Sequence, residues 1–194
     1  APRLLNPNEV ITGMEGLLRR LIGEDIALET RLAPEPGRVQ ADPSQLDQVL
    51  MNLVVNAREA MPAGGRVIIE TEVLPLTATP LRDRPQATAV DAVVLRVTDT
   101  GIGMTAETIS RIFEPFFTTK AVGKGSGLGL SMAYGIVEQS GGRLEVSSVP
   151  GQGSTFSVYL PRVAEAPAVP ADPGAATPHR LAAPPRLATI LLVE

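Results

Sequence analysis

The sequence predicts an α+β domain in which helices cover one face of a mixed, mainly antiparallel sheet. Three observations carry this prediction. Segments with apolar residues at helical spacing alternate with segments in which every second residue is apolar. The later strand-type segments come in consecutive pairs that can form antiparallel hairpins. Each strand has a single apolar face, which needs one covering layer of helices, so a two-layer sandwich is expected.

The composition excludes several classes of protein. The chain has 194 residues, with no Cys, one His and a formal net charge of −4. Without Cys it can form neither a disulfide framework nor a thiolate metal site, and one His excludes a multi-histidine metal centre. The negative charge argues against a nucleic-acid partner. No uninterrupted apolar run reaches the roughly 18 residues that a membrane span needs.

Helix signals are clearest in the first third of the chain. Apolar spacing predicts a helix over residues 8–22, and alternation predicts a strand over 26–32. Asp42-Pro43-Ser44-Gln45 is a typical helix start, with Asp as N-cap, Pro at N1 and Gln at N3. We expect this second helix to end near Met61, before Pro62 and two glycines.

The remaining elements are expected to be two hairpins and one helix. The first hairpin is expected to pair residues 67–73 with 93–98, the helix to span 126–140, and the second hairpin to pair 144–148 with 155–160. Residues 74–89 are expected to be a long hairpin loop. Residues 104–122 are also expected to form a loop, and they hold three of the four Phe. A long loop with concentrated aromatic residues predicts a lid that folds over a ligand.

The C-terminal part has a different composition. Seven Pro and nine Ala occur in residues 161–188, which predicts an extended linker. Residues 189–194 form a short apolar run typical of a buried strand. We therefore expect a domain over 1–160, a linker over 161–188 and the start of another domain at 189–194. The single histidine, His179, lies in the linker and is expected to be an exposed linker residue.

Three polar side chains share one face of the helix that begins after Asp42. Asn52, Asn56 and Glu59 fall within about 60° of one another at 3.6 residues per turn, beside the apolar stripe. Buried carboxamides are costly unless paired. They either bond nearby backbone or form a ligand line, because an Asn carbonyl oxygen suits Mg²⁺.

Two glycine-rich segments also predict ligand contact. Asp99-Thr100-Gly101-Ile102-Gly103-Met104 ends a strand, where Asp99 is either part of a simple turn or accepts a hydrogen bond from a purine amine. Residues 123–129 have Gly at every second position before a helix, which indicates either a phosphate cradle or a flexible loop. Lys120, between them, is either a phosphate partner or a solvated surface residue.

Together these segments resemble the ATP-binding catalytic domain of sensor histidine kinases, within the wider superfamily of gyrase, chaperone and histidine-kinase ATPases. The resemblance covers residues 6–160 and consists of five motifs in order. They are similar to the N box, the first glycine box, the F box, the second glycine box and the final Gly-Thr turn, at residues 48–61, 99–104, 113–120, 125–130 and 151–156. The resemblance implies the Bergerat-type form of the sandwich, with a long ATP lid.

The resemblance also implies a ligand and roles for individual residues. The ligand is ATP or ADP, with Mg²⁺ bound by Asn56; Asn56 and Lys120 are the catalytic residues, and Asp99 holds the adenine amino group. The other implied nucleotide contacts are Asn52, Glu59, Ala60, Gly101, Gly103, Met104, Phe117, Gly125, Ser126, Gly127, Leu128, Gly129, Leu130 and Thr155. Glu59 departs from the pattern, because other members carry Lys there, so the phosphate contact at this position is in question.

The resemblance implies transfer to a histidine rather than hydrolysis. ATPases of the superfamily that use water place a general-base Glu four residues before the magnesium Asn, where this chain has Asn52. General-base catalysis contributes roughly 10²- to 10⁴-fold, so we expect slow hydrolysis. The phosphoacceptor histidine is expected on a dimerisation domain upstream of Ala1. The chain alone is therefore expected to bind nucleotide as a monomer without phosphorylating itself.

Further partners follow from the tail. Residues 190–194 are similar to the first strand of a receiver domain, which implies a hybrid kinase working in a two-component phosphorelay. The domain is expected in the cytoplasm, with no membrane contact of its own and any anchor of the parent protein upstream. Three alternatives stay open: a Ser/Thr kinase of the anti-sigma type, a hydrolytic gyrase- or chaperone-like ATPase, and a non-catalytic scaffold without nucleotide affinity.

Overall fold

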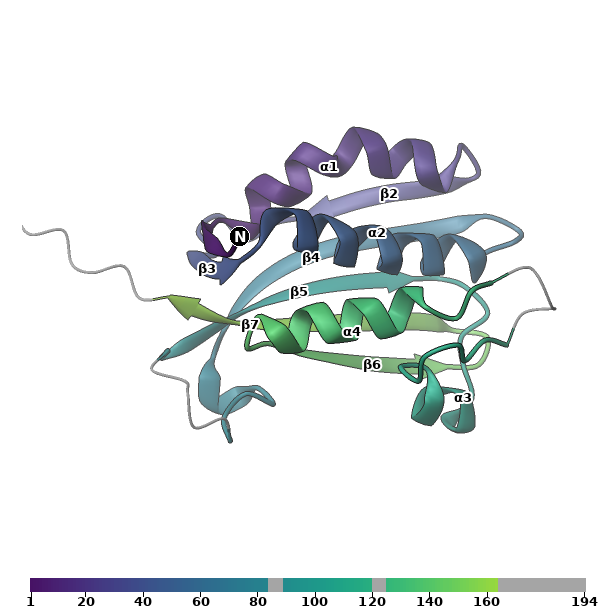
Figure 1. Ribbon diagram of the computed structural model, residues 1–194. Coiled ribbons are helices and arrows are strands. Elements are labelled where there is room, and N and C mark those ends of the chain that lie inside the picture. Colours follow the sequence, from purple (N-terminus) through teal and green to yellow (C-terminus); the bar gives the residue numbers. More distant parts are fainter. Residues whose placement is uncertain (84–88, 120–124, 164–194) are drawn as a thin grey trace, which may run out of the picture.

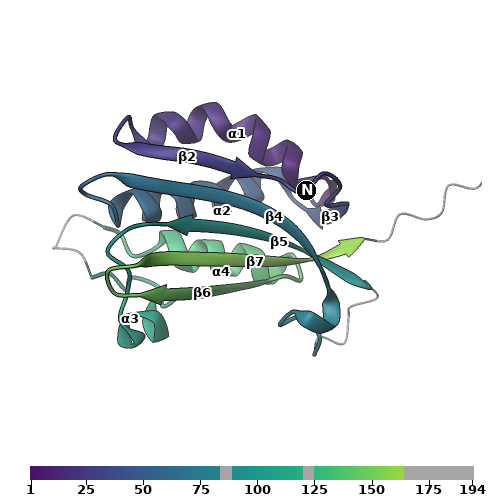
Figure 2. The same cartoon turned by 180° about the vertical axis from the view of Figure 1, so that it is seen from behind.

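The protein is described here by a computed structural model that covers residues 1–83, 89–119 and 125–163. Over these residues a seven-stranded sheet has the order β1-β3-β7-β5-β4-β2, with β6 also paired to β7. Figure 1 shows α1, α2 and α4 side by side on one face of this sheet. In Figure 2 the sheet lies in front of the same helices. The predicted two-layer sandwich is confirmed.

The sheet is mainly antiparallel. Its one parallel pairing among the described strands joins β2 to β4, and the other ladders are antiparallel. In chain order the elements are β1 (Arg3–Leu5), α1 (Pro7–Ile22), β2 (Ile26–Arg31), β3 (Arg38–Ala41), α2 (Pro43–Glu59), β4 (Gly65–Pro75), the 3₁₀ turn η1 (Leu76–Ala78), β5 (Asp91–Asp99), α3 (Ala106–Arg111), α4 (Gly129–Gln139), β6 (Arg143–Val149) and β7 (Gly153–Val163).

The core lies between the helices and the sheet. Ile11, Met14 and Leu18 follow one another at helical spacing on α1 and are buried. The apolar stripe of α2 and the inward faces of β4, β5 and β7 complete the core through Leu46, Val49, Leu50, Leu53, Ala57, Val67, Ile69, Leu95, Val97, Phe156 and Val158. Within the described chain, no helix is both long and apolar enough to cross a membrane.

The opposite face of the sheet is mostly polar. Side chains on neighbouring strands form ion pairs across it, such as Arg31 with Glu70 and Arg96 with Glu72. At one end, a small second cluster of Leu76, Leu81 and Ala92 packs beneath the loop that follows β4. The helices therefore cover one face alone, as the single apolar face of each strand predicted.

Short elements account for most of the differences from the sequence-based prediction. The strands β1 and β3 were not predicted, because three or four residues give little alternation to detect. The segment 104–122, predicted as loop, contains α3. The hydroxyl of Thr105 caps this helix by accepting a hydrogen bond from the Thr108 amide at 3.2 Å.

Two boundaries also differ for clear reasons. Helix α4 begins at Gly129 rather than at Ser126, because Gly127 adopts φ = +65°, which a right-handed helix does not allow. Strand β7 runs on to Val163, because Arg162 and Val163 pair with β3. The rest of the predicted linker, the C-terminal run 189–194 and His179 lie outside the described residues.

A partly buried polar network joins α1 to the sheet. The Thr71 hydroxyl accepts from the Ala33 amide at 2.8 Å and donates to Asn8 Oδ1 at 2.8 Å. Asn8 Nδ2 donates back to the Ala33 carbonyl at 2.7 Å. Replacing Thr71 by Val keeps the shape but leaves the Ala33 amide unpaired. We expect the free energy of unfolding to fall by about 1–3 kcal/mol in urea titrations; an unchanged midpoint would contradict this.

Candidate functional site

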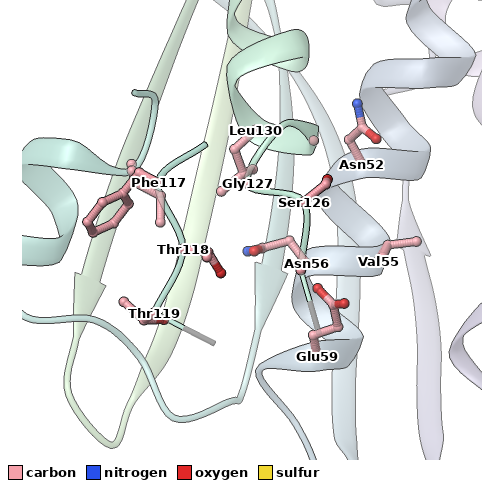
Figure 3. A pocket seen from close by; sticks show the side chains of 13 residues that line it. Asn52, Val55, Asn56, Glu59, Phe117, Thr118, Thr119, Ser126, Gly127 and Leu130 are labelled. Atoms are coloured by element: carbon pink, nitrogen blue, oxygen red, sulfur yellow. The ribbon is translucent and has the colours of Figure 1, made fainter. Parts of the chain in front are cut away.

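An open pocket of about 230 Å³ lies between α2, the segment after α3 and the glycine-rich turn before α4. Figure 3 shows side chains from these three segments around it. Most of the predicted phosphate-side residues line it, namely Asn52, Asn56, Glu59, Phe117, Gly125, Ser126, Gly127, Gly129 and Leu130. The pocket is also lined by four residues that were not predicted: Val55, Ile112, Thr118 and Thr119. Lys120 lies outside the described residues.

The polar line on α2 forms one wall of this pocket. Asn56 points across it towards Thr118, while Glu59 follows one turn later on the same wall (Figure 3). Asn52 stands beside the first residue of α4, Gly129. The Nδ2 atom of Asn52 is buried and has no hydrogen-bond partner among the described residues. A buried amide nitrogen left without a partner is costly, so Asn52 is not satisfied by bonding the nearby described backbone through this nitrogen.

A backbone contact closes the base of the lid segment. The Phe116 amide donates to the Gly127 carbonyl at 3.0 Å, which brings the two sides of the segment together. Phe116 has φ = +67°, an uncommon conformation for a residue with a side chain. A Cβ on Gly127 would lie only 2.4 Å from the Phe116 carbonyl carbon, so this contact requires glycine.

Aromatic side chains attach the lid segment to the body. Phe113 packs against Tyr134 of α4 with ring centroids 5.1 Å apart. Arg111 lies over the Phe117 ring at 4.5 Å and also pairs with Glu114 at 3.1 Å. Phe113 therefore anchors this segment to α4, whereas Phe117 packs within the segment and the Phe116 side chain is exposed.

Asp99 has the most unusual environment of the candidate residues. It ends β5 and is only 2% exposed. Its Oδ1 accepts a hydrogen bond from the Gly101 amide at 2.8 Å, while Oδ2 is buried with no partner in the described part of the chain. Burial raises the pKa of this carboxyl, and the amides of Gly101 and Ser154 partly oppose that rise. A donor from a ligand would satisfy Oδ2.

The loop after Asp99 is fixed to two other elements. The Ile102 amide donates to the Ala60 carbonyl at 2.9 Å, and the Gly151 amide donates to the Ile102 carbonyl at 2.7 Å. The Met104 amide donates to the Ser148 hydroxyl at 2.8 Å. The predicted residues Ala60, Gly101, Gly103 and Met104 are thus gathered around Asp99, between the end of α2 and the β6–β7 turn.

The position predicted for Thr155 is not supported by the strand register. Thr155 bonds Thr98 across the ladder at 3.0 Å, on the face opposite to Asp99. The residue directly opposite Asp99 is Ser154, which is buried on the helix-covered side. Alternation along β7, where Phe156 and Val158 face the core, could have identified Ser154, because residues two apart share a face. Leu128 lies just before α4, outside the lining of the pocket.

These features define a class of protein. The family model described as histidine kinase-, DNA gyrase B- and HSP90-like ATPase matches residues 41–164. The chain belongs to this family. Its nucleotide-binding fold is the one expected from the five sequence motifs.

Individual relatives narrow the comparison. The chain is 45% identical to the sensor kinase CckA of Brucella abortus over 199 residues, covering all of this chain and 21% of that protein. It is 35% identical to the sensor histidine kinase ZraS of Salmonella typhi, covering 82% of this chain and 31% of that one. The chain therefore spans between a fifth and a third of the length of these curated relatives.

Solved structures agree with the sequence relatives. The mycobacterial sensor histidine kinase MprB superposes with a TM-score of 0.66 at 27% identity, covering 84% of this chain and all of that one. Full-length ShkA, solved in complex with AMPPNP, gives a TM-score of 0.67 at 25% identity, covering 86% of this chain and 32% of that one. These likenesses support the fold assignment.

Proposed function

We propose that this domain binds Mg²⁺–ATP and donates the γ-phosphoryl group to a histidine on another domain, in two-component signalling. The observation that carries the proposal is the buried Oδ2 of Asp99, which has no hydrogen-bond partner among the described residues. A carboxylate oxygen in this position is matched by the amino group of adenine, which supplies the missing donor. The other residues gathered around Asp99, including Ala60, Gly103 and Met104, would then surround the base.

The pocket next to α2 fits the phosphates and Mg²⁺. The amide oxygens of Asn52 and Asn56 are hard ligands of the kind that magnesium prefers, and we assign Asn56 as the principal ligand. Mg²⁺, when bound, would neutralise charge on the phosphates. The glycine-rich turn exposes backbone amides at the start of α4, where the helix dipole favours an anion. Lys120 is proposed as a further phosphate contact.

Residue chemistry favours phosphoryl transfer over hydrolysis. Asn52 occupies the position from which a Glu would activate water, and an amide cannot take that proton. Catalysis would then depend mainly on positioning and charge neutralisation. The acceptor histidine would lie on a dimerisation domain and the receiver domain would follow the linker, with this segment itself monomeric and in the cytoplasm.

Replacing Asn56 by Ala tests the proposal at the magnesium site. We expect the Kd for ADP with Mg²⁺ to rise at least about tenfold in calorimetry, because one charge-assisted ligand contact is lost. Without Mg²⁺ the variant and the wild type should bind ADP almost equally. Thermal unfolding should change little, since the Asn56 side chain lines an open pocket.

The control is Gln45→Ala, which removes an amide side chain at the other end of α2. It should leave ADP binding unchanged. A wild-type chain with no affinity for ADP would overturn the proposal in favour of a non-catalytic scaffold. Steady phosphate release from ATP by the chain alone would instead favour a hydrolytic ATPase.

A further inference from the structure

Ser148, on β6, is the central residue of a hydrogen-bond network at the end of the site around Asp99, where the adenine base would bind. We call this the base end of the site. Its hydroxyl donates to the Gly153 carbonyl at 2.8 Å and accepts from the Met104 amide at 2.8 Å. It also lies 2.9 Å from the hydroxyl of Ser154. Ser148 was not among the predicted site residues, yet it joins the loop after Asp99 to the β6–β7 turn.

The direction of the Ser148–Ser154 hydrogen bond follows from counting protons. A serine hydroxyl has one proton to donate and two lone pairs that accept. The proton of Ser148 is used on the Gly153 carbonyl, since a carbonyl can only accept, and one of its lone pairs takes the Met104 amide. With that proton on Gly153, the network is fully used when Ser154 donates its own proton to Ser148, which leaves the Ser154 oxygen only lone pairs for any other partner.

This fixed direction matters because Ser154 lies directly opposite Asp99 in the β5–β7 ladder, with both side chains on the same face. Directly opposed residues in a ladder have Cβ atoms roughly 5 Å apart. A shallow hollow at this end of the sheet is lined by Asp99, Ser148 and Ser154 together with Thr98, Ser147 and Thr155 of the other face. On the helix-covered face, Asp99 Oδ2 and Ser154 Oγ can act only as acceptors while Asp99 is ionised.

We propose that Ser148 is a positioning residue that makes the base end of this site selective for a purine with a 6-amino group over a 6-oxopurine. This rests on the proposed nucleotide-binding function. An adenine amine donates two protons and matches two acceptors, whereas the carbonyl of hypoxanthine would face them unpaired. Ser148 contributes without touching the base, by holding the proton of Ser154 away and by fixing the Met104 backbone.

The test compares ADP with inosine diphosphate, which carries a carbonyl in place of the amine. In the Ser148→Ala variant the hydroxyl of Ser154 is free to rotate and to donate to the 6-oxo group, while the Met104 amide loses its acceptor. We expect the Kd for ADP to rise about tenfold, with a much smaller change for inosine diphosphate. The ratio of the Kd for inosine diphosphate to the Kd for ADP should therefore fall at least about threefold. Ser148→Thr retains the hydroxyl and should restore the ratio.

If Ser148 had a purely structural role, Ser148→Ala would weaken the binding of both nucleotides by the same factor, and that result would overturn the inference. Ser148→Ala that binds both nucleotides like the wild type would overturn it as well. If Ser148→Ala fails to fold, Ser154→Ala serves instead, because it removes the oriented acceptor and should also lower the ratio. Ser140→Ala is the matched control: its hydroxyl donates to the Ile136 carbonyl at the end of α4, and neither Kd should change. Failure of the proposed function is distinguishable, since the wild type would then bind neither nucleotide.

Discussion

Replacing Asp99 by Asn is expected to weaken ADP binding at least about 100-fold and, at the same time, to stabilise the nucleotide-free domain. The Gly101 amide bonds Oδ1 at 2.8 Å, so the oxygen of an Asn would stay at that position. The NH₂ group would then replace Oδ2 and present a donor to the adenine amine, which is also a donor. Loss of a charge-assisted hydrogen bond and gain of this repulsion together exceed about 2.7 kcal/mol.

The gain in stability follows from the pKa of Asp99. Burial raises that pKa above its ordinary value of 3.8, so between 3.8 and the raised pKa the folded state binds more protons than the unfolded state. Stability therefore falls as the pH rises through this window and stays reduced above it. Urea unfolding at pH 7 should show Asp99→Asn as the more stable protein, with the difference shrinking as the pH falls towards 3.8.

Nucleotide binding should have the opposite pH dependence. Protonation of Asp99 places a hydrogen on an oxygen that must accept from adenine, so the wild-type Kd for ADP should rise as the pH falls through the raised pKa. Asp99→Asn should lack this dependence, and Asp47→Asn on α2 should behave as the wild type. A variant at Asp99 that binds ADP normally, or that unfolds more easily than the wild type at pH 7, would contradict the assignment.

How far the sequence predicts this molecule depends on the length of each element. The helices α1 and α2 were predicted almost to the residue, because each has a capping side chain and several turns of apolar spacing. Asn6 and Asp42 both accept a hydrogen bond from the amide two residues later. The strands β1 and β3 were missed because their identity depends on pairing with each other and with β7, which local sequence does not encode.

The candidate site likewise combines residues that local sequence patterns predict with residues that only the folded structure brings together. Motif spacing placed Asn52, Asn56 and Glu59 on one wall and identified Asp99, since these depend on helical period and on the end of a strand. The register sets Ser154 rather than the predicted Thr155 directly opposite Asp99, and in a strand a shift of one residue reverses the face. The contribution of Ser148 could not be predicted, because it requires β6, the loop at Met104 and the β6–β7 turn to meet in space.

Gly103 should be the most sensitive glycine of the loop after Asp99. Its φ is +66°, and a Cβ placed there would lie 2.0 Å from the Val149 carbonyl oxygen. The left-handed conformation alone costs a non-glycine residue about 1–2 kcal/mol. The overlap cannot be relieved by a side-chain rotation, because the atom it meets is backbone. We expect Gly103→Ala to lower the free energy of unfolding by about 3 kcal/mol or more and to abolish measurable ADP binding.

Gly151 in the neighbouring β6–β7 turn provides a matched control. Its φ is +78°, but a Cβ there would meet nothing within 4 Å. Gly151→Ala should therefore carry only the conformational cost and retain ADP binding, so the difference between the two variants measures the close approach of the loop to Val149. If both variants lost the same stability and bound ADP alike, the packing of this loop against β6 would not be what shapes the base end of the site.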